Sequence, residues 1–347
     1  MTSKKNNKAK IFGIIALVIL LVGGVIAFKA YQLFLGASVT GNEKYLYVRS
    51  TDTYEDVLNR IREQKIVKDA DDFDFVAQRM NYPNLVKPGK YRLIEGMGNR
   101  RLVGDLRGGF QEPVNLKFSN IRLKENFAAF LGKQFEADSA QFIAVLDDAA
   151  IAEKYGFAKD NFYTMFIPNT YEMYWNTSPE KIVERFNEEY KKFWNADRIA
   201  KAKAQNLSPV EVSILASIVR GEALHTDEMP MIAGLYLNRL KKGMLLQADP
   251  TVIFANNDFT IRRVLNKHLT IDNPYNTYRY KGLPPGPINM PPIVAIDAVL
   301  NPASHDYIYM CAKEDFSGYH AFATNVSDHL VNARKFQKAL DERNIKK

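Results

Sequence analysis

The 347-residue sequence predicts an α+β fold in three parts: a single N-terminal transmembrane helix, a small βααβ module and a larger mixed α+β domain. The transmembrane helix is predicted at residues 11–28, which carry no charge. The module is predicted at residues 41–107, where the pattern is strand, helix, helix, strand, and capped helices recur across residues 114–347. With 46% apolar and 25% charged residues, the composition excludes a disordered or collagen-like chain.

The uncharged segment at residues 11–28 is long enough to cross a membrane. As a helix it rises roughly 27 Å, near the thickness of the bilayer core. Only Lys29 follows it closely, whereas four lysines precede it: Lys4, Lys5, Lys8 and Lys10. The positive-inside rule therefore places the basic tail, residues 1–10, in the cytoplasm and the rest of the chain across the membrane. A cleaved signal peptide is the alternative, but its apolar region usually spans only about 7–15 residues, and residues 25–27 (VIA) make a poor cleavage site.

The module at residues 41–107 is expected to contain two strands and two helices. Residues 45–48 form a short apolar run typical of a strand, and residues 91–93 continue as a second strand after the turn sequence KPGK. Thr53 with Asp56 three residues later is a helix-start signature. Helically spaced apolar positions follow in both helices: Val57, Leu58 and Ile61, then Phe73, Val76, Ala77 and Met80. Residues 108–113 (GGFQEP) mark the boundary with the next domain.

Two helices of the larger domain are predicted from their ends. Thr177 and Glu180 match a capping box, with Pro179 in the first turn. An apolar stripe follows: Ile182, Val183, Phe186, Tyr190, Phe193 and Trp194. A further helix is predicted at residues 326–344, rich in Lys and Arg towards its end.

One helix places a carboxylic acid among apolar residues. Ser208 and Glu211 form a second capping box, which fixes the start of this helix. Four side chains then share one face: Leu215, Ile218, Val219 and Glu222. Burial disfavours an ionised carboxylate, so the pKa of Glu222 should rise, as a proton donor to a glycosidic oxygen requires. The alternative is that Glu222 ends the helix and turns to solvent or pairs with Arg220 or Arg239, because charged residues are mostly exposed.

Motifs around this helix carry a resemblance to a known family. They are FIPNTY at residues 166–171, ASIVRGEA at 216–223, LNRL at 237–240, GM at 243–244, LQADPTV at 246–252, NPYNTY at 273–278, GLPPGPI at 282–288, and HAF at 320–322 with Asn325. In this order they resemble the MltG (YceG-like) family of endolytic murein transglycosylases. The anchor and the βααβ module also match, since the family carries a membrane segment and a LysM-like module before its catalytic domain. Where the family often has Glu-x-Glu, this chain has Arg220-Gly221-Glu222.

The resemblance implies that residues 114–347 are a lytic transglycosylase catalytic domain. It also implies a bacterial protein that is anchored in the inner (plasma) membrane and holds this domain outside the cytoplasm. Such an enzyme cleaves the β-1,4 bond between N-acetylmuramic acid and N-acetylglucosamine within peptidoglycan glycan strands, here nascent strands of the growing wall. Glu222 matches the family's catalytic acid/base. A single carboxylate can suffice, because the C6 hydroxyl of the muramic acid attacks the anomeric carbon and leaves a 1,6-anhydro end.

The other motif residues are expected to bind substrate. Gln247, Asn276 and Thr277 offer hydrogen bonds to N-acetyl groups and hydroxyls, and Thr251 belongs to the same set. Tyr275 and Tyr278 offer stacking faces, although tyrosines also serve in cores and Asn-Pro segments form turns in any case. Asp249, before Pro250 in a predicted turn, is either a second carboxylate or a structural residue, and the structural role is favoured. His320 either binds substrate or has its hydrogen bonds satisfied within the protein.

Several other functions are not expected. The sequence has no zinc-protease, serine-hydrolase or P-loop motif, and its lone cysteine, Cys311, excludes an intrachain disulfide and is interpreted as a buried apolar residue. No metal and no cofactor is expected. The net charge of +8 suits an anionic neighbour, but nucleic acid is not expected beyond a membrane anchor. The expected partners are glycan strands and the membrane, with cell-wall synthases as candidates. Two alternatives remain: a glycoside hydrolase that uses Asp249 as its second carboxylate, and a wall-binding scaffold without activity.

Overall fold

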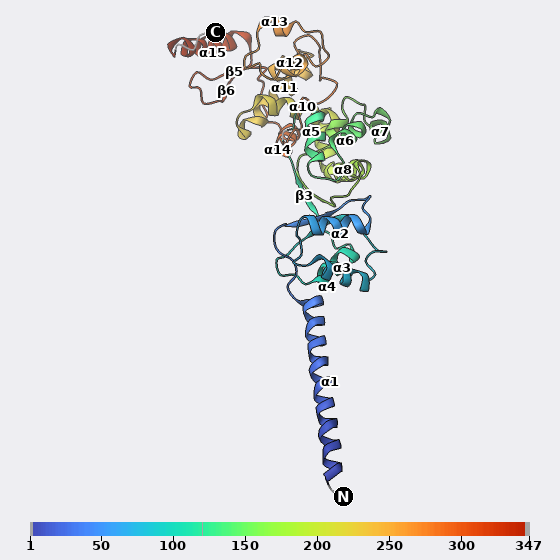
Figure 1. The fold of residues 1–347 in the computed structure, drawn as a ribbon. Coiled ribbons are helices and arrows are strands. Elements are labelled where there is room, and N and C mark those ends of the chain that lie inside the picture. The colour runs from blue at the N-terminus through green and yellow to red at the C-terminus, as the bar shows by residue number, and fades with distance from the viewer. Residues whose placement is uncertain (1–2, 120, 344–347) are drawn as a thin grey trace. The chain divides into compact units, whose positions relative to one another are not determined.

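The computed structural model describes residues 3–119 and 121–343, and it divides into two compact units. The first comprises Met1–Val114 with Glu172–Thr177, and the second Asn115–Tyr171 with Ser178–Lys347. Figure 1 shows the elements along the chain. The first two residues of the predicted basic tail and the last four of the predicted catalytic domain lie outside the described residues.

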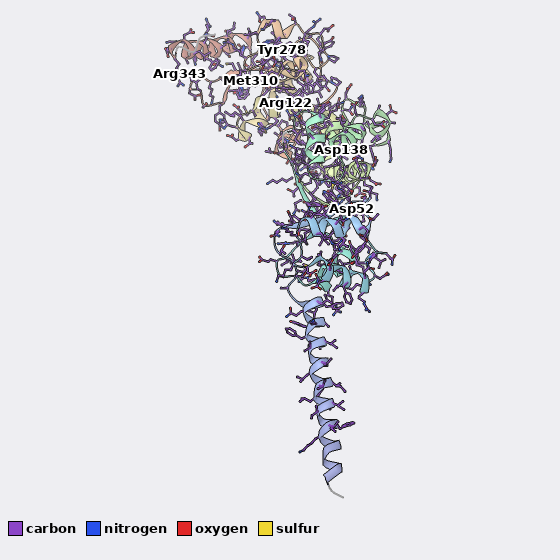
Figure 2. All side chains as sticks on the ribbon, viewed as in Figure 1. Asp52, Arg122, Asp138, Tyr278, Met310 and Arg343 are labelled. Carbon is purple, nitrogen blue, oxygen red and sulfur yellow. The ribbon has the colours of Figure 1, made fainter. Side chains whose placement is uncertain are left out.

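The chain begins with one long apolar helix, α1 (Ser3–Leu35), which is longer at both ends than the predicted segment 11–28. Its part from Lys10 to Leu35 is long and apolar enough to cross a membrane, and no other helix of the described residues is. From Lys10 onward side chains project from more than one side of it, and most of its large apolar residues are more than half exposed, Phe12 by 77% (Figure 2). These properties are compatible with a single-pass anchor; the orientation of that anchor stays a prediction.

The rest of the first unit contains the predicted order of strand, helix, helix and strand. The elements are β1 (Tyr45–Val48), α2 (Tyr54–Glu63), α3 (Ala70–Arg79) and β2 (Gly89–Arg92), followed by α4 (Asn99–Gly108), which was not predicted. β1 and β2 are antiparallel, with Tyr45 opposite Arg92. The capping box of Thr53 and Asp56 is present at the start of α2, and Val57, Ile61 and Phe73 are fully buried between the helices and the sheet. The LysM-like character of this module stays a prediction.

The remaining elements are mostly helical. β3 (Val114–Lys117) pairs with β4 (Thr170–Met173), and β5 (Tyr309–Ala312) is antiparallel to β6 (His320–Ala323). The helices are α5 (Lys124–Gly132), α6 (Ser139–Leu146), α7 (Ala149–Lys154), α8 (Pro179–Phe193), α9 (Ala196–Ala204), α10 (Pro209–Glu222), α11 (Met229–Lys241), α12 (Asp249–Asn256), α13 (Asn266–Leu269), α14 (Ile293–Leu300) and α15 (Val326–Glu342). Two short 3-10 helices lie at Phe162–Met165 and Thr226–Glu228. A mixed helix and strand fold is thereby confirmed.

Two predicted helix ends and one predicted turn need correction. The capping box at Thr177 is wrong: Ser178 caps α8, and its hydroxyl accepts from the amide of Lys181, the third residue of the helix. Asp249 does not lie in a turn but begins α12, because the following proline fits the first turn of a helix. The last predicted helix ends at Glu342 in the structure, and its predicted end, Asn344, lies outside the described residues.

Helix α10 forms the centre of the larger unit. Its capping box, Ser208 with Glu211, is present as predicted. Every residue from position 212 to 219 is buried, so this helix is covered on all sides and not on one face alone. α11 and α14 pack against it. Ser217 connects it to a loop, because its hydroxyl accepts from the amide of Ile288 and its carbonyl accepts from the side chain of Asn289.

Candidate active site

Glu222 is the last residue of α10 and opens into a cavity of about 240 Å³. The side chain is half-buried, and the hydroxyl of Tyr236 on α11 donates to its Oε1 at 2.9 Å. Gly221, the residue before it, allows α12 to approach, since a Cβ there would lie 2.8 Å from Cβ of Pro250. The cavity walls come from α10, α11, the start of α12 and β5, and its lining residues are Glu222, Leu235, Tyr236, Arg239, Leu246, Gln247, Asp249, Tyr278, Met310, Cys311, Ala312 and His320.

Burial raises the pKa of Glu222 to about 7. The hydrogen bond from Tyr236 opposes this rise, the negative charge of Asp249 adds to it, and the positive charge of Arg239 opposes it. Among the described residues Glu222 makes no ion pair with Arg220 or Arg239, and Arg220 instead donates to the carbonyl of Ala223 at 3.0 Å. The carboxyl group of Glu222 is therefore suited to hold a proton at neutral pH and to release it.

Arg239 lies one turn from Tyr236 on α11 and is only 6% exposed. Its Nε donates to the carbonyl of Ile308 at 2.6 Å, and its Nη1 donates to the carbonyl of Leu246 at 2.7 Å and to Oε1 of Gln247 at 3.3 Å. No carboxylate pairs with it within the described chain. The guanidinium thus joins α11 to the segments that contain Leu246 and Ile308, which form other walls of the cavity. It also brings a positive charge into the cavity.

The segment that carries Gln247 has a demanding backbone conformation. Gln247 has φ +52°, in the left-handed region that residues other than glycine seldom adopt, and its amide donates to the carbonyl of Thr277. Below it, Thr251 and Thr277 are fully buried and hydrogen-bond to each other at 2.8 Å and to the backbone of Ala248. The strained backbone conformation of Gln247 persists only where the neighbouring structure holds it, and these buried threonine contacts do so here. Thr251 and Thr277 therefore lie under the wall of the cavity and not on its surface.

Asp249 and Tyr278 form one edge of the cavity. Asp249 is exposed, and its Oδ1 accepts from the hydroxyl of the half-buried Tyr278 at 2.6 Å. The cavity thus contains two carboxylates, Glu222 and Asp249. Asn276 is fully buried next to this edge, where its side-chain amide donates to the carbonyls of Leu269 and Ile271.

His320 begins β6 at the opposite side of the cavity. The buried carboxylate of Glu228 accepts from its backbone amide at 2.7 Å and lies 2.8 Å from its Nδ1. This contact orients the imidazole ring, and Nε2 has no hydrogen-bond partner among the described residues. Cys311 also lines the wall; burial raises the pKa of its thiol, which keeps it protonated at neutral pH.

Tyr275 lies apart from the other predicted residues. Its ring packs on Phe254 at 4.7 Å between centroids, and it lines a different cavity of about 220 Å³ with Arg122, Tyr163 and Phe166. The structure therefore brings Glu222, Gln247, Asp249, Tyr278 and His320 into one cavity. It buries Thr251, Asn276 and Thr277 beside that cavity and places Tyr275 elsewhere.

Three residues of this site had no function predicted from the sequence: Tyr236, Arg239 and Glu228. Tyr236 and Arg239 are spaced i, i+3 on one helix, which places both on one face. That spacing was visible in the sequence, but nothing in it indicates that this face meets the end of α10. Glu228 gave no local signal, because its partner His320 lies 92 residues away.

Comparison with known proteins places this geometry in context. The model of the YceG-like family matches residues 46–335. A protein of Streptococcus pneumoniae named endolytic murein transglycosylase is 25% identical over 361 aligned positions, which cover 94% of this chain and 65% of that protein. One of the same name from Bacillus subtilis is 36% identical over 144 positions, 42% of this chain and 39% of the relative. A crystal structure of a yceG-like protein from Listeria monocytogenes has a TM-score of 0.54 at 24% identity, covering 83% of this chain and 97% of that one. The chain thus spans just under two thirds of the streptococcal relative.

Proposed function

The chain belongs to the YceG-like family, and from this premise we propose that it is an endolytic lytic transglycosylase of peptidoglycan. The bond cleaved is the β-1,4 linkage between N-acetylmuramic acid and N-acetylglucosamine within a glycan strand, and the product carries a 1,6-anhydromuramic end. Two relatives carry the name of this activity. The observation that carries the proposal is Glu222, a half-buried carboxyl group with a pKa of about 7 that opens into a polar cavity.

Glu222 acts first as the general acid. With a pKa of about 7, roughly half of the molecules hold the proton at neutral pH. That proton goes to the glycosidic oxygen as the bond to the muramic acid C1 breaks, which such catalysis accelerates by about 10²–10⁴. The hydroxyl of Tyr236 remains on Oε1 and stabilises the carboxylate that forms.

Glu222 then acts as the general base. Its carboxylate takes the proton of the C6 hydroxyl, whose oxygen attacks C1 of the same sugar, so the acid is regenerated and no water enters. The intramolecular nucleophile has a high effective concentration, which compensates for the absence of a protein nucleophile. Asp249 contributes a negative charge that raises the pKa of Glu222 and offsets positive charge developing at C1.

The remaining residues hold the glycan. Gln247 and the free Nε2 of His320 offer hydrogen bonds to N-acetyl groups and hydroxyls, and the ring of Tyr278 offers a stacking face. Thr251, Asn276 and Thr277 contribute indirectly, since they fix the walls on which Gln247 and Tyr278 stand. Tyr275 lines a separate cavity, where it contacts a part of the strand beyond the Glu222 cavity.

The second candidate function is hydrolysis, and the presence of Asp249 in the same cavity favours it. A hydrolase needs a second carboxylate as nucleophile or as the base for water. The two reactions differ in their products, because an anhydro end is lighter by one water than a reducing end.

The experiment is digestion of purified sacculi by the full-length protein in detergent, followed by mass analysis of the muropeptides. We expect anhydro ends, with fragments longer than disaccharides at the earliest times. Glu222→Gln should abolish cleavage, and Glu184→Gln, an exposed glutamate of α8, is the matched control that should leave it unchanged. Products with reducing ends would contradict the transglycosylase reaction and would support hydrolysis with Asp249 as the second carboxylate. No cleavage by the wild-type protein would favour the scaffold without activity.

The same proposal includes the setting of the enzyme. The N-terminus lies in the cytoplasm, α1 crosses the plasma membrane once, and the catalytic domain faces the wall. The module at residues 41–107 is LysM-like, and the substrate is the nascent strand made by cell-wall synthases. The lysines that precede residue 11 support the orientation.

A further inference from the structure

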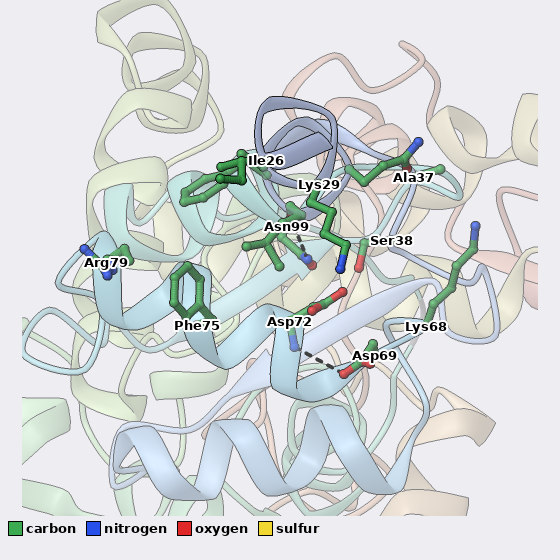
Figure 3. Close-up of a pocket in the computed structure, with 14 residues that line it drawn as sticks. Ile26, Lys29, Ala37, Ser38, Lys68, Asp69, Asp72, Phe75, Arg79 and Asn99 are labelled. Carbon is green, nitrogen blue, oxygen red and sulfur yellow. Dashed lines mark hydrogen bonds between the residues drawn. The ribbon is translucent and has the colours of Figure 1, made fainter. Parts of the chain in front are cut away.

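A third cavity, of about 900 Å³, lies in the first unit where α1 meets the module (Figure 3). We call it the juxtamembrane pocket. Its lining residues are Ile26, Lys29, Ala30, Gln32, Leu33, Phe34, Ala37, Ser38, Lys68, Asp69, Asp72, Phe75, Arg79 and Asn99. Its walls are the end of α1, the segment after it, α3 and the start of α4. The volume falls within the range of about 300–1,000 Å³ that is typical of ligand sites.

The position of this pocket along α1 corresponds to the lipid headgroups. Residues 11–28 are uncharged and rise roughly 27 Å, which nearly fills the hydrocarbon core of a bilayer. Lys29 and the residues that follow it therefore stand in the interfacial layer, about 5–7 Å thick on each side. A pocket that opens there has membrane lipid as its nearest neighbour.

The pocket contains three cationic side chains without ion pairs. Lys29, Lys68 and Arg79 line it, and none makes an ion pair within residues 3–119 and 121–343. Arg79 instead lies over the ring of Phe75, 5.1 Å from its centroid, and that ring is 44% exposed. Cations together with exposed apolar surface, here Phe75 and Ile26, match a phosphate that is linked to an acyl chain.

The pocket also contains two acceptors without donors. Asn99 is 2% exposed; its amide nitrogen donates to the carbonyl of Leu33, but its Oδ1 has no hydrogen-bond partner in the described structure. Figure 3 shows Asn99, Lys29 and Asp72 gathered at the centre of the pocket. Asp69 is occupied by capping α3, whereas the carboxylate of Asp72 has no hydrogen bond or ion pair among the described residues. The Oδ1 of Asn99 is enclosed by protein, whereas the carboxylate of Asp72 is exposed and is open to a charged donor group that a ligand can supply.

We propose that the juxtamembrane pocket binds the headgroup of an amine-bearing glycerophospholipid of the bilayer, such as phosphatidylethanolamine. The phosphate contacts Lys29, Lys68 and Arg79, the ammonium donates to the carboxylate of Asp72, and the acyl chains leave past Ile26 and Phe75. Desolvation, followed by the negative charges of Asp69 and Asp71, raises the pKa of Asp72, and the ammonium offsets that charge repulsion. This inference requires α1 to lie in a membrane but does not depend on the proposed reaction.

The test is native mass spectrometry of the delipidated full-length protein in detergent, titrated with phosphatidylethanolamine or phosphatidylcholine. Phosphatidylcholine carries the same phosphate, but its ammonium has no N–H to donate. One charge-assisted hydrogen bond corresponds to about tenfold in affinity, so we expect the wild type to bind phosphatidylethanolamine about tenfold more tightly.

Three exposed positions supply the variants, which preserves the fold. Asp72→Asn should bring the ratio between the two lipids close to one, because the ammonium loses its charged acceptor. Lys68→Gln should weaken both lipids about tenfold, because the phosphate loses a partner. The matched control is Arg100→Gln, which removes one charge from α4 next to Asn99 but does not line the pocket. Equal affinity of the wild type for both lipids would overturn the proposal, and so would equal effects of Lys68→Gln and Arg100→Gln.

Discussion

Replacing Tyr236 by phenylalanine tests how the acidity of Glu222 is set. The hydroxyl of Tyr236 donates to Oε1 of Glu222 at 2.9 Å and lowers the pKa of that carboxyl group, in opposition to burial. A hydrogen bond to a charged group contributes about 1.5–3 kcal/mol, and 1.36 kcal/mol corresponds to one pKa unit. Tyr236→Phe should therefore raise the pKa of Glu222 from about 7 by roughly one to two units.

The assay is the pH profile of kcat/KM for glycan cleavage. The general acid must be protonated in the free enzyme, so activity falls as the pH rises through the pKa of Glu222. In Tyr236→Phe the descending limb of the profile should move to higher pH, while the maximal rate drops because the carboxylate that forms loses its donor. The matched control is Tyr280→Phe, which removes a tyrosine hydroxyl donating to Asp272 outside the cavity. A descending limb that stays in place in Tyr236→Phe, or moves to lower pH, would refute this account.

Three further results are expected. Asp249→Asn removes a negative charge that raises the pKa of Glu222, so the descending limb of the pH profile should move to lower pH while activity is retained. Complete loss of activity would instead indicate that Asp249 is a nucleophile or a base. Glu222→Gln should stabilise the protein above pH 7 by up to roughly 3 kcal/mol, measured by thermal unfolding. The reason is that the pKa of Glu222 is about 4.5 in the unfolded chain and about 7 in the folded protein, so the wild type loses stability as the pH rises between these values. The glutamine does not titrate, so the variant keeps that stability. Unchanged stability at pH 8 would contradict the raised pKa. A reporter active only in the cytoplasm, fused to the C-terminus, should be inactive; its activity would contradict the orientation of α1.

Local signals in the sequence predicted the elements but not all of their ends. The start of α10 was predicted because Ser208 and Glu211 satisfy each other's backbone amides, a purely local interaction. The same reasoning failed at Thr177, because the adjacent Ser178 can also cap a helix and puts Pro179 in its first position. Asp249 with Pro250 was assigned to a turn for a similar reason, since Asp-Pro starts both turns and helices. Choosing between such neighbours requires knowledge of what the segment packs against.

The site was predictable only in part, because its contacts are long-range. The motifs indicated Glu222, and burial at the end of α10 agrees with the expected rise of its pKa. The contacts that set this pKa come from Tyr236 and Asp249, 14 and 27 positions away, and periodicity does not show which helix faces meet. Thr251 and Thr277, in contrast, were predicted to bind substrate but lie in the interior. Their hydroxyls suit a sugar as well as each other, and only the structure shows them paired in the interior.

The carbonyl contacts of Arg239 have a consequence for the charge balance of the reaction. Because backbone oxygens and Gln247 hold this guanidinium, no dedicated carboxylate among the described residues cancels its positive charge. With Glu222 protonated, Arg239 and Asp249 balance each other and the three groups together are neutral. When Glu222 gives up its proton, the negative charge it gains appears in the same step as the positive charge at the sugar C1. The sum over cavity and substrate therefore stays near zero through bond cleavage, so no counter-ion has to enter or leave during the proposed reaction.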